Sequence, residues 1–132
     1  MFLVDTSVWI DYLRGNSTAS VAKLQDILDE GQPFGITSLI LQEILQGTDS
    51  EASFARLETY LRTQIFFHPS DPLSTHVEAA RIYARCRRAG VTIRSTIDCL
   101  VAQTAIEHGL FLLHSDRDFD RIASLVPELE TF

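Results

Sequence analysis

Short apolar segments alternate along this chain with longer stretches in which apolar residues recur every three to four positions. The clearest short segments are Phe2–Val4 and Phe111–Leu113, and weaker ones cover Pro33–Ile36 and Ile65–His68. Runs of this kind are typical of buried strands, and helices between them indicate a parallel sheet that is covered on both faces. The sequence therefore predicts an α/β fold, a three-layer α/β/α sandwich with a short and mainly parallel sheet.

The helical stretches are bounded by residues that commonly begin and end helices. We expect helices over residues 6–13, 17–30, 38–46, 50–62, 72–89, 96–108 and 119–125. Glycines follow several of these stretches where a left-handed C-cap is favoured, at Gly15, Gly31, Gly47, Gly90 and Gly109. No repeat, linker or low-complexity segment interrupts the pattern, so residues 1–132 are expected to form a single domain.

Composition limits the environment of the protein. With 45% of its 132 residues hydrophobic, the chain can close a core without disulfides or a structural metal. No apolar run approaches the ~20 residues of a membrane span, and the N-terminus does not resemble a signal peptide. Cys86 and Cys99 are too few for a disulfide framework. We therefore expect a reduced, cytoplasmic protein that is not in a membrane.

The net charge of −7, from 18 acidic and 11 basic residues, argues by itself against a nucleic-acid partner. That argument weakens if several acids form one metal site, because bound divalent ions invert the local field. Composition alone leaves the partner undecided.

Two acids follow the two clearest strands. Ligands of parallel sheets gather at the carboxyl ends of the strands, and there the chain places Asp5 and Asp116. Asp5 is also suited to cap a helix, but Thr6 and Ser7 are equally suited, so a cap does not explain the acid. Ser115 and Asp118 have the spacing of a capping box, which gives Asp118 a structural role and leaves Asp116 without one.

Two further acids occupy helices. Glu43 interrupts an apolar stripe, and burying an unpaired carboxylate costs several kcal/mol unless a cation binds it or its pKa is raised. The alternative is a Glu at the margin of the stripe that reaches solvent. Asp98 lies in the first turn of the most hydrophobic helix, where a capping pair with Ser95 is the alternative to a ligand role.

Together the sequence predicts one divalent-metal site whose catalytic and metal-binding residues are Asp5, Glu43, Asp98 and Asp116. Carboxylates without a Cys/His set match a hard cation, so we expect Mg²⁺, with Mn²⁺ able to substitute. Carboxylates that converge without metal repel one another, and at least one should have a raised pKa.

These segments resemble the PIN-domain family, specifically the VapC-type toxins of bacterial toxin–antitoxin pairs. The resemblance covers essentially the full chain and is carried by residues 1–15, 37–47, 93–102 and 112–123. It implies an RNA endonuclease, a homodimer, and neutralisation by a cognate VapB-type antitoxin. The acidic ligands of the family correspond to the four acids above, and its small hydroxyl residue to Thr6. We expect Thr6, Ser115 and Asp118 to support the site.

An acidic protein that binds RNA needs local positive charge. Five of the eleven basic residues fall within fourteen positions just before Asp98: Arg81, Arg85, Arg87, Arg88 and Arg94. We expect Arg85, Arg87, Arg88 and Arg94 to contact RNA phosphates. The alternative is a solvated helix face on which Glu78 pairs with Arg81.

Two predicted helices carry more aromatic and aliphatic bulk than one core contact needs. With the help of the family resemblance, these residues are expected to border a groove for an antitoxin segment: Trp9, Tyr12, Leu13, Phe54, Leu57 and Tyr60. Ordinary helix–helix packing is the alternative for each of them.

Other classes of protein also place acids at strand ends. A phosphorylation receiver domain needs a lysine late in the chain, whereas the only lysine here is Lys23. A haloacid-dehalogenase-type phosphatase needs a second Asp where this chain has Ser7. A PIN-like interaction module without catalysis stays open. For an active enzyme, attack by water rather than by the RNA 2′-hydroxyl predicts 5′-phosphate and 3′-hydroxyl products.

Overall fold

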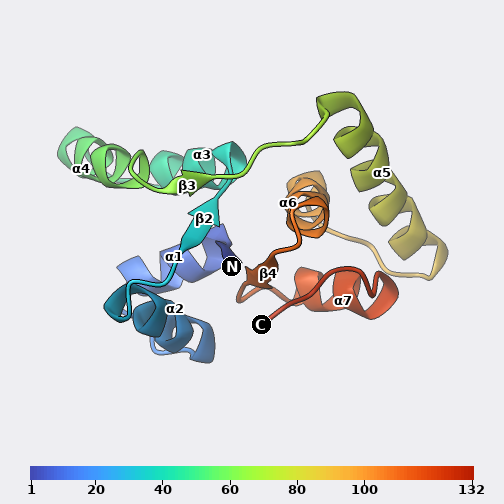
Figure 1. Ribbon diagram of the computed structural model, residues 1–132, viewed down its shortest axis with the longest axis horizontal. Helices are drawn as coiled ribbons and strands as arrows, with labels where there is room; N and C mark the ends of the chain where they lie inside the picture. The colour runs from blue at the N-terminus through green and yellow to red at the C-terminus, as the bar shows by residue number, and fades with distance from the viewer.

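A sheet of four parallel strands runs through the centre of the computed structural model, which describes residues 1–132 (Figure 1). The strand order is β3-β2-β1-β4, with β1 Phe2–Val4, β2 Phe34–Ile36, β3 Ile65–Phe66 and β4 Phe111–Leu113. Phe2 pairs with both Phe34 and Phe111, so the first strand lies between the second and the last. All four predicted strands are present.

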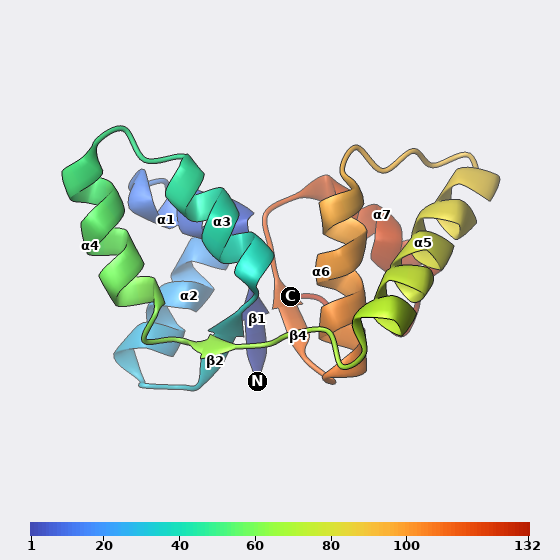
Figure 2. The same cartoon turned by 90° about the horizontal axis from the view of Figure 1, so that it is seen from above.

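Seven helices connect and cover these strands. They are α1 Thr6–Leu13, α2 Ala19–Asp29, α3 Ser38–Gln46, α4 Glu51–Leu61, α5 Pro72–Arg88, α6 Thr96–Glu107 and α7 Arg117–Leu125. Figure 2 shows α1 to α4 on one side of the central strands and α5 to α7 on the other. The predicted α/β sandwich is confirmed. No helix is long and apolar enough to cross a membrane.

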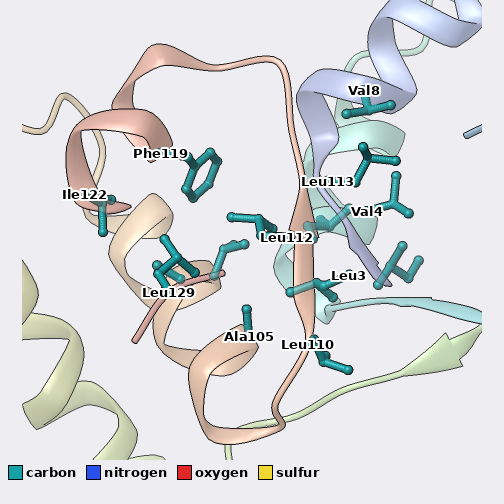
Figure 3. Close-up of a cluster of buried hydrophobic side chains, with 14 of the residues drawn as sticks. Leu3, Val4, Val8, Ala105, Leu110, Leu112, Leu113, Phe119, Ile122 and Leu129 are labelled. Carbon is teal, nitrogen blue, oxygen red and sulfur yellow. The ribbon is translucent and has the colours of Figure 1, made fainter. Parts of the chain in front are cut away.

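The adjacent strands β1 and β4 are buried on both faces toward their carboxyl ends. Leu3, Val4, Leu112 and Leu113 are fully buried, and Figure 3 shows Phe119 of α7 beside this cluster. Burying a side chain of this kind contributes roughly 1.5–3 kcal/mol. This double burial explains the uninterrupted apolar runs of β1 and β4. Each of these strands ends where its apolar run ends.

Two predicted details of the helix ends are wrong, namely the left-handed C-cap at Gly47 and the start of α7. Gly15, Gly31, Gly90 and Gly109 have positive φ angles, but Gly47 has a φ of −86°. The chain after α3 continues in a right-handed turn in which the Gly47 N–H donates to the Ile44 carbonyl, so no left-handed residue is needed. Helix α7 begins at Arg117 rather than Phe119, because an earlier residue caps it.

Candidate active site

The carboxyl ends of β1 and β4 bring two of the predicted acids to the same edge of the sheet. Val4 is paired with Leu113, and the Asp5 N–H donates to the Leu113 carbonyl at 2.9 Å. The loop after β4 leads to Asp116 three residues later. In Figure 2, helix α6 begins at this same end of the molecule, with the loop from α5 leading into it.

Asp98 lies close enough to the other predicted acids for their charges to affect its pKa. Burial, followed by the charges of four neighbouring carboxylates, raises its pKa to about 7; these neighbours are Asp5, Asp116, Asp118 and Glu43. Asp98 accepts no hydrogen bond and forms no ion pair with a basic side chain. The prediction that at least one acid has a raised pKa without metal is confirmed.

Asp5 is both a helix cap and a buried acid. Its Oδ2 accepts hydrogen bonds from the Ser7 N–H at 2.9 Å and the Ser7 hydroxyl at 2.6 Å. Burial nevertheless raises the pKa of Asp5, whose exposed fraction is 5%. The Ser7 oxygen also accepts from the Ser115 N–H at 3.0 Å, so Ser7 ties the ends of both strands together.

Ser7 was missed at the sequence level, where its hydroxyl indicated only a capping role. Ser115 reaches the site through its backbone N–H, while the residue itself is exposed. The supporting role of Ser115 stays a prediction, and the contact seen is made by its main chain.

Glu43 projects from α3 toward the start of α1. The buried Thr6 hydroxyl donates to Glu43 Oε1 at 2.9 Å. Burial and the charge of Asp5 raise the pKa of Glu43, and the Thr6 hydrogen bond lowers it. Thr6 thus lies next to Asp5 in the chain and holds Glu43 by a hydrogen bond, and its supporting role stays a prediction.

Asp116 has a structural role that the sequence did not indicate. It is the N-cap of α7, and its Oδ1 accepts from the Asp118 N–H at 2.9 Å. The same oxygen accepts from Arg94 Nη2 at 2.9 Å. The predicted capping pair of Ser115 and Asp118 is wrong, because the chain enters the helix one residue later than that pair requires.

Asp118 is fully buried and is contacted by two arginines, and its supporting role stays a prediction. Its carboxylate accepts from the Arg94 N–H at 3.1 Å, from Arg94 Nε at 3.0 Å and from Arg121 Nη1 at 3.1 Å. Burial would raise the pKa of Asp118, but the hydrogen bonds and charges of Arg94 and Arg121 lower it overall. The two arginines therefore favour the charged form of the Asp118 carboxylate.

The four predicted ligands at this edge of the sheet offer only carboxylate oxygens to a metal ion. No three Asp, Glu, His or Cys side chains form a ready cluster of ligands. Asp98 accepts no hydrogen bond, and Glu43 and Asp116 each accept hydrogen bonds on only one of their two oxygens. All three carboxylates therefore keep at least one free oxygen. Mg²⁺ takes oxygen ligands, binds one or two carboxylates and keeps several waters. These residues fit such an ion, and the four-ligand set stays a prediction.

The predicted RNA-binding arginines separate into two places. Arg85 and Arg88, with Arg81, line a groove of about 390 Å³ between α5, α6 and the chain after α7. Arg87 is exposed but lies outside that groove. None of the four predicted ligands lines it. Arg94, in contrast, contacts the acidic site directly.

A larger groove of about 620 Å³ lies between α1, α3 and α4. Three predicted antitoxin contacts line it, namely Leu13, Leu57 and Tyr60, and so does Glu43. The groove therefore borders the acidic site.

The prediction for Trp9 is wrong. Its exposed fraction is only 2%, and its ring packs against Phe34 and Tyr12, since it lies on the inward face of α1. Tyr12 and Phe54 are half-buried and pack against the core outside the walls of the larger groove. Fewer of the predicted antitoxin contacts thus line the groove than expected.

Comparison with known proteins agrees with this architecture. A family model for the PIN domain matches residues 2–125. Ribonuclease VapC11 of Mycobacterium tuberculosis is 35% identical over 126 residues, which cover 95% of this chain and 93% of that protein. Ribonuclease VapC19 of the same organism is 28% identical over 128 residues, covering 96% and 98%.

Solved structures show the same fold at lower identity. VapBC-1 from nontypeable Haemophilus influenzae has a TM-score of 0.72 at 17% identity, covering 99% of this chain and 96% of that one. VapBC2 from Rickettsia felis, bound to a DNA fragment from its promoter, has a TM-score of 0.71 with the same identity and coverage. The chain belongs to the PIN-domain family. Its similarity to the VapC11 ribonuclease extends over nearly the whole length of both proteins.

Proposed function

We propose that this protein is a Mg²⁺-dependent endoribonuclease of the VapC type, the toxin of a VapB–VapC pair. The observation that carries the proposal is the convergence of carboxylates on Asp98. Burial and the charges of these neighbours raise the pKa of Asp98 to about 7. A carboxylate held among other carboxylates without a hydrogen-bond donor is stabilised by a cation. The full-length similarity to VapC ribonucleases supports RNA as the substrate.

The residues of the chain prepare this site for hydrolysis of a phosphodiester bond. A bound divalent ion would lower the pKa of a water and neutralise charge on the leaving oxygen. Asp98, Glu43 and Asp116 would hold the ion together with Asp5. Thr6 fixes Glu43, and Ser7 fixes Asp5 against the end of β4. Carboxylates fixed in this way need little reorganisation during the reaction.

Cleavage of RNA by the purified protein tests this function. We expect cleavage with Mg²⁺ or Mn²⁺ and none in excess EDTA. Binding of RNA without cleavage under any of these conditions would instead favour the PIN-like interaction module.

We infer that the groove between α1, α3 and α4 receives a segment of the antitoxin. Leu13 and Tyr60 line it with exposed fractions of 49% and 42%, so the groove offers a partner accessible apolar surface. Several solved neighbours are VapBC structures, which supports a partner of this kind.

Replacing Leu13 with Glu is expected to weaken binding of the cognate VapB-type antitoxin by about tenfold or more, because a charge would enter an apolar contact. Ala22→Glu is the matched control, since Ala22 is exposed on α2 outside the groove. Calorimetric titration measures both affinities. Equal affinities for the two variants would remove the groove from the antitoxin interface.

The groove lined by Arg81, Arg85 and Arg88 is proposed to hold RNA phosphates. The double substitution Arg85→Ala with Arg88→Ala should weaken RNA binding and reduce the salt slope of log K by about 1.4, or roughly 0.7 for each lost phosphate contact. Arg87→Ala, outside the groove, should change both quantities less. Affinities measured between 50 and 200 mM salt check this prediction, and an unchanged slope would assign the arginines to a solvated face.

The homodimer stays a proposal as well. Exposed Leu73 and Val77 give α5 an apolar surface, which supports contact with a second copy of the chain.

A further inference from the structure

Arg94 bridges two acids at the border of the candidate active site. Its Nε and its backbone N–H both donate to Asp118 Oδ2, at 3.0 and 3.1 Å. Its Nη2 donates to Asp116 Oδ1 at 2.9 Å. Because Asp118 is fully buried and also paired with Arg121, it fixes the inner edge of the Arg94 guanidinium.

Among the four proposed ligands, only Asp116 is paired with a basic side chain. Asp116 forms an ion pair with Arg94, whereas Asp5, Glu43 and Asp98 form no ion pair. Arg94 therefore neutralises one carboxylate of a crowded anionic site. Any cation that binds Asp116 reduces the attraction between that carboxylate and Arg94.

The outer edge of the guanidinium has unused donors. A guanidinium carries five N–H groups, and here Nε and Nη2 make the only side-chain hydrogen bonds of Arg94. The side chain is 70% exposed, so the remaining donors face solvent beside the acids. A planar fork in this position matches the oxygens of a phosphate.

We propose that Arg94 is an internal counterion of Asp116 that turns to an RNA phosphate when a divalent cation takes over that carboxylate. Asp118 is its positioning residue and holds Nε in both states. This inference rests on the proposed function, since it requires RNA and a cation at the same site. It gives Arg94 opposite effects on two ligands: it competes with the cation and attracts the phosphate.

Binding of Mn²⁺ in the absence of RNA tests the first effect. Arg94→Gln should bind Mn²⁺ about two- to five-fold more tightly than the wild-type protein, as expected from loss of one exposed ion pair. Arg62→Gln is the matched control, because Arg62 is as exposed as Arg94 but pairs only with Glu58. The signal of free Mn²⁺ in electron paramagnetic resonance gives both affinities.

Binding of single-stranded RNA tests the second effect, with Ca²⁺ in place of Mg²⁺ and the RNA checked for integrity afterwards. Arg94→Gln should lose about tenfold in affinity, with a salt slope lower by about 0.7. Asp118→Asn should weaken RNA binding in the wild-type protein but not further in Arg94→Gln, because Asp118 acts through Arg94. Arg62→Gln should retain wild-type RNA affinity.

The two arms give a distinct pattern. Tighter Mn²⁺ binding with weaker RNA binding in Arg94→Gln supports the proposal. Unchanged affinities, or weaker binding of both ligands, would make Arg94 a structural tie and overturn it. If the wild-type protein binds no RNA, the proposed function fails and this inference with it. If the wild-type protein binds and cleaves RNA while Arg94→Gln binds it equally well, only the inference fails.

Discussion

The Asp98→Asn variant is expected to cleave RNA about 10²- to 10³-fold more slowly than the wild-type protein, the usual cost of removing one electrostatic group from an active site. Asp98 is surrounded by the other acids and accepts no hydrogen bond, so an amide in its place would break none. The substitution removes the charge with little change in shape. Initial rates on a labelled RNA in Mg²⁺ measure the effect.

Asp26→Asn is the matched control, because Asp26 is exposed on α2 and makes no ion pair. It should cleave RNA at the wild-type rate. Circular dichroism should show that both variants keep the fold. Wild-type activity in Asp98→Asn would remove this residue from the active site.

Without metal, the same Asp98→Asn substitution should stabilise the protein near pH 7.5. The ordinary pKa of Asp98 is 3.8, and in the folded protein burial and neighbouring charges raise it to about 7. Between these values the unfolded chain ionises while the folded protein keeps the proton, so stability falls as pH rises from about 4 to about 7. Asn carries no charge and avoids this loss.

The size of the gain follows from the same pKa values. The full shift corresponds to ~4 kcal/mol at ~1.4 kcal/mol per pH unit, but Asp98 is only half-buried and water screens its neighbours. We therefore expect the variant to be ~1–2 kcal/mol more stable than the wild-type protein at pH 7.5, and equal to it at pH 4.

Urea unfolding in EDTA at a series of pH values measures this difference. Asp118, whose pKa is lowered, has the opposite dependence and loses stability as pH falls, but it is present in both proteins and cancels in the comparison. Mg²⁺ should raise the melting temperature of the wild-type protein more than that of Asp98→Asn. A constant difference between the two proteins across the pH range would contradict the raised pKa.

The strands, their order of appearance and the acids that follow them were predictable because buried parallel strands require uninterrupted apolar runs. Phe2–Val4 and Phe111–Leu113 satisfy this requirement, and Asp5 and Asp116 follow them. Glu43 was recognisable because a carboxylate within an apolar stripe conflicts with burial. These signals are local, since each depends on residues within one or two helical turns.

The features that were missed depend on contacts between distant segments. The Arg94 contacts join the start of α6 to the start of α7, and the Ser7 contact joins the ends of β1 and β4. Trp9 has an aromatic side chain suited to an interface, but the rotation of α1 turns it into the core. Local patterns do not determine which of two apolar faces packs inward when a helix carries both.

The chemical ends of the RNA products test the central claim most directly. Cleavage by the purified wild-type protein in Mg²⁺ should yield 5′-phosphate and 3′-hydroxyl ends, because water attacks the phosphorus at a site built from carboxylates, and EDTA should prevent it. Ligation-based sequencing with and without prior phosphorylation of the 5′ ends identifies the products. Products with 2′,3′-cyclic phosphate ends, formed equally well in EDTA, would contradict hydrolysis at the site around Asp98.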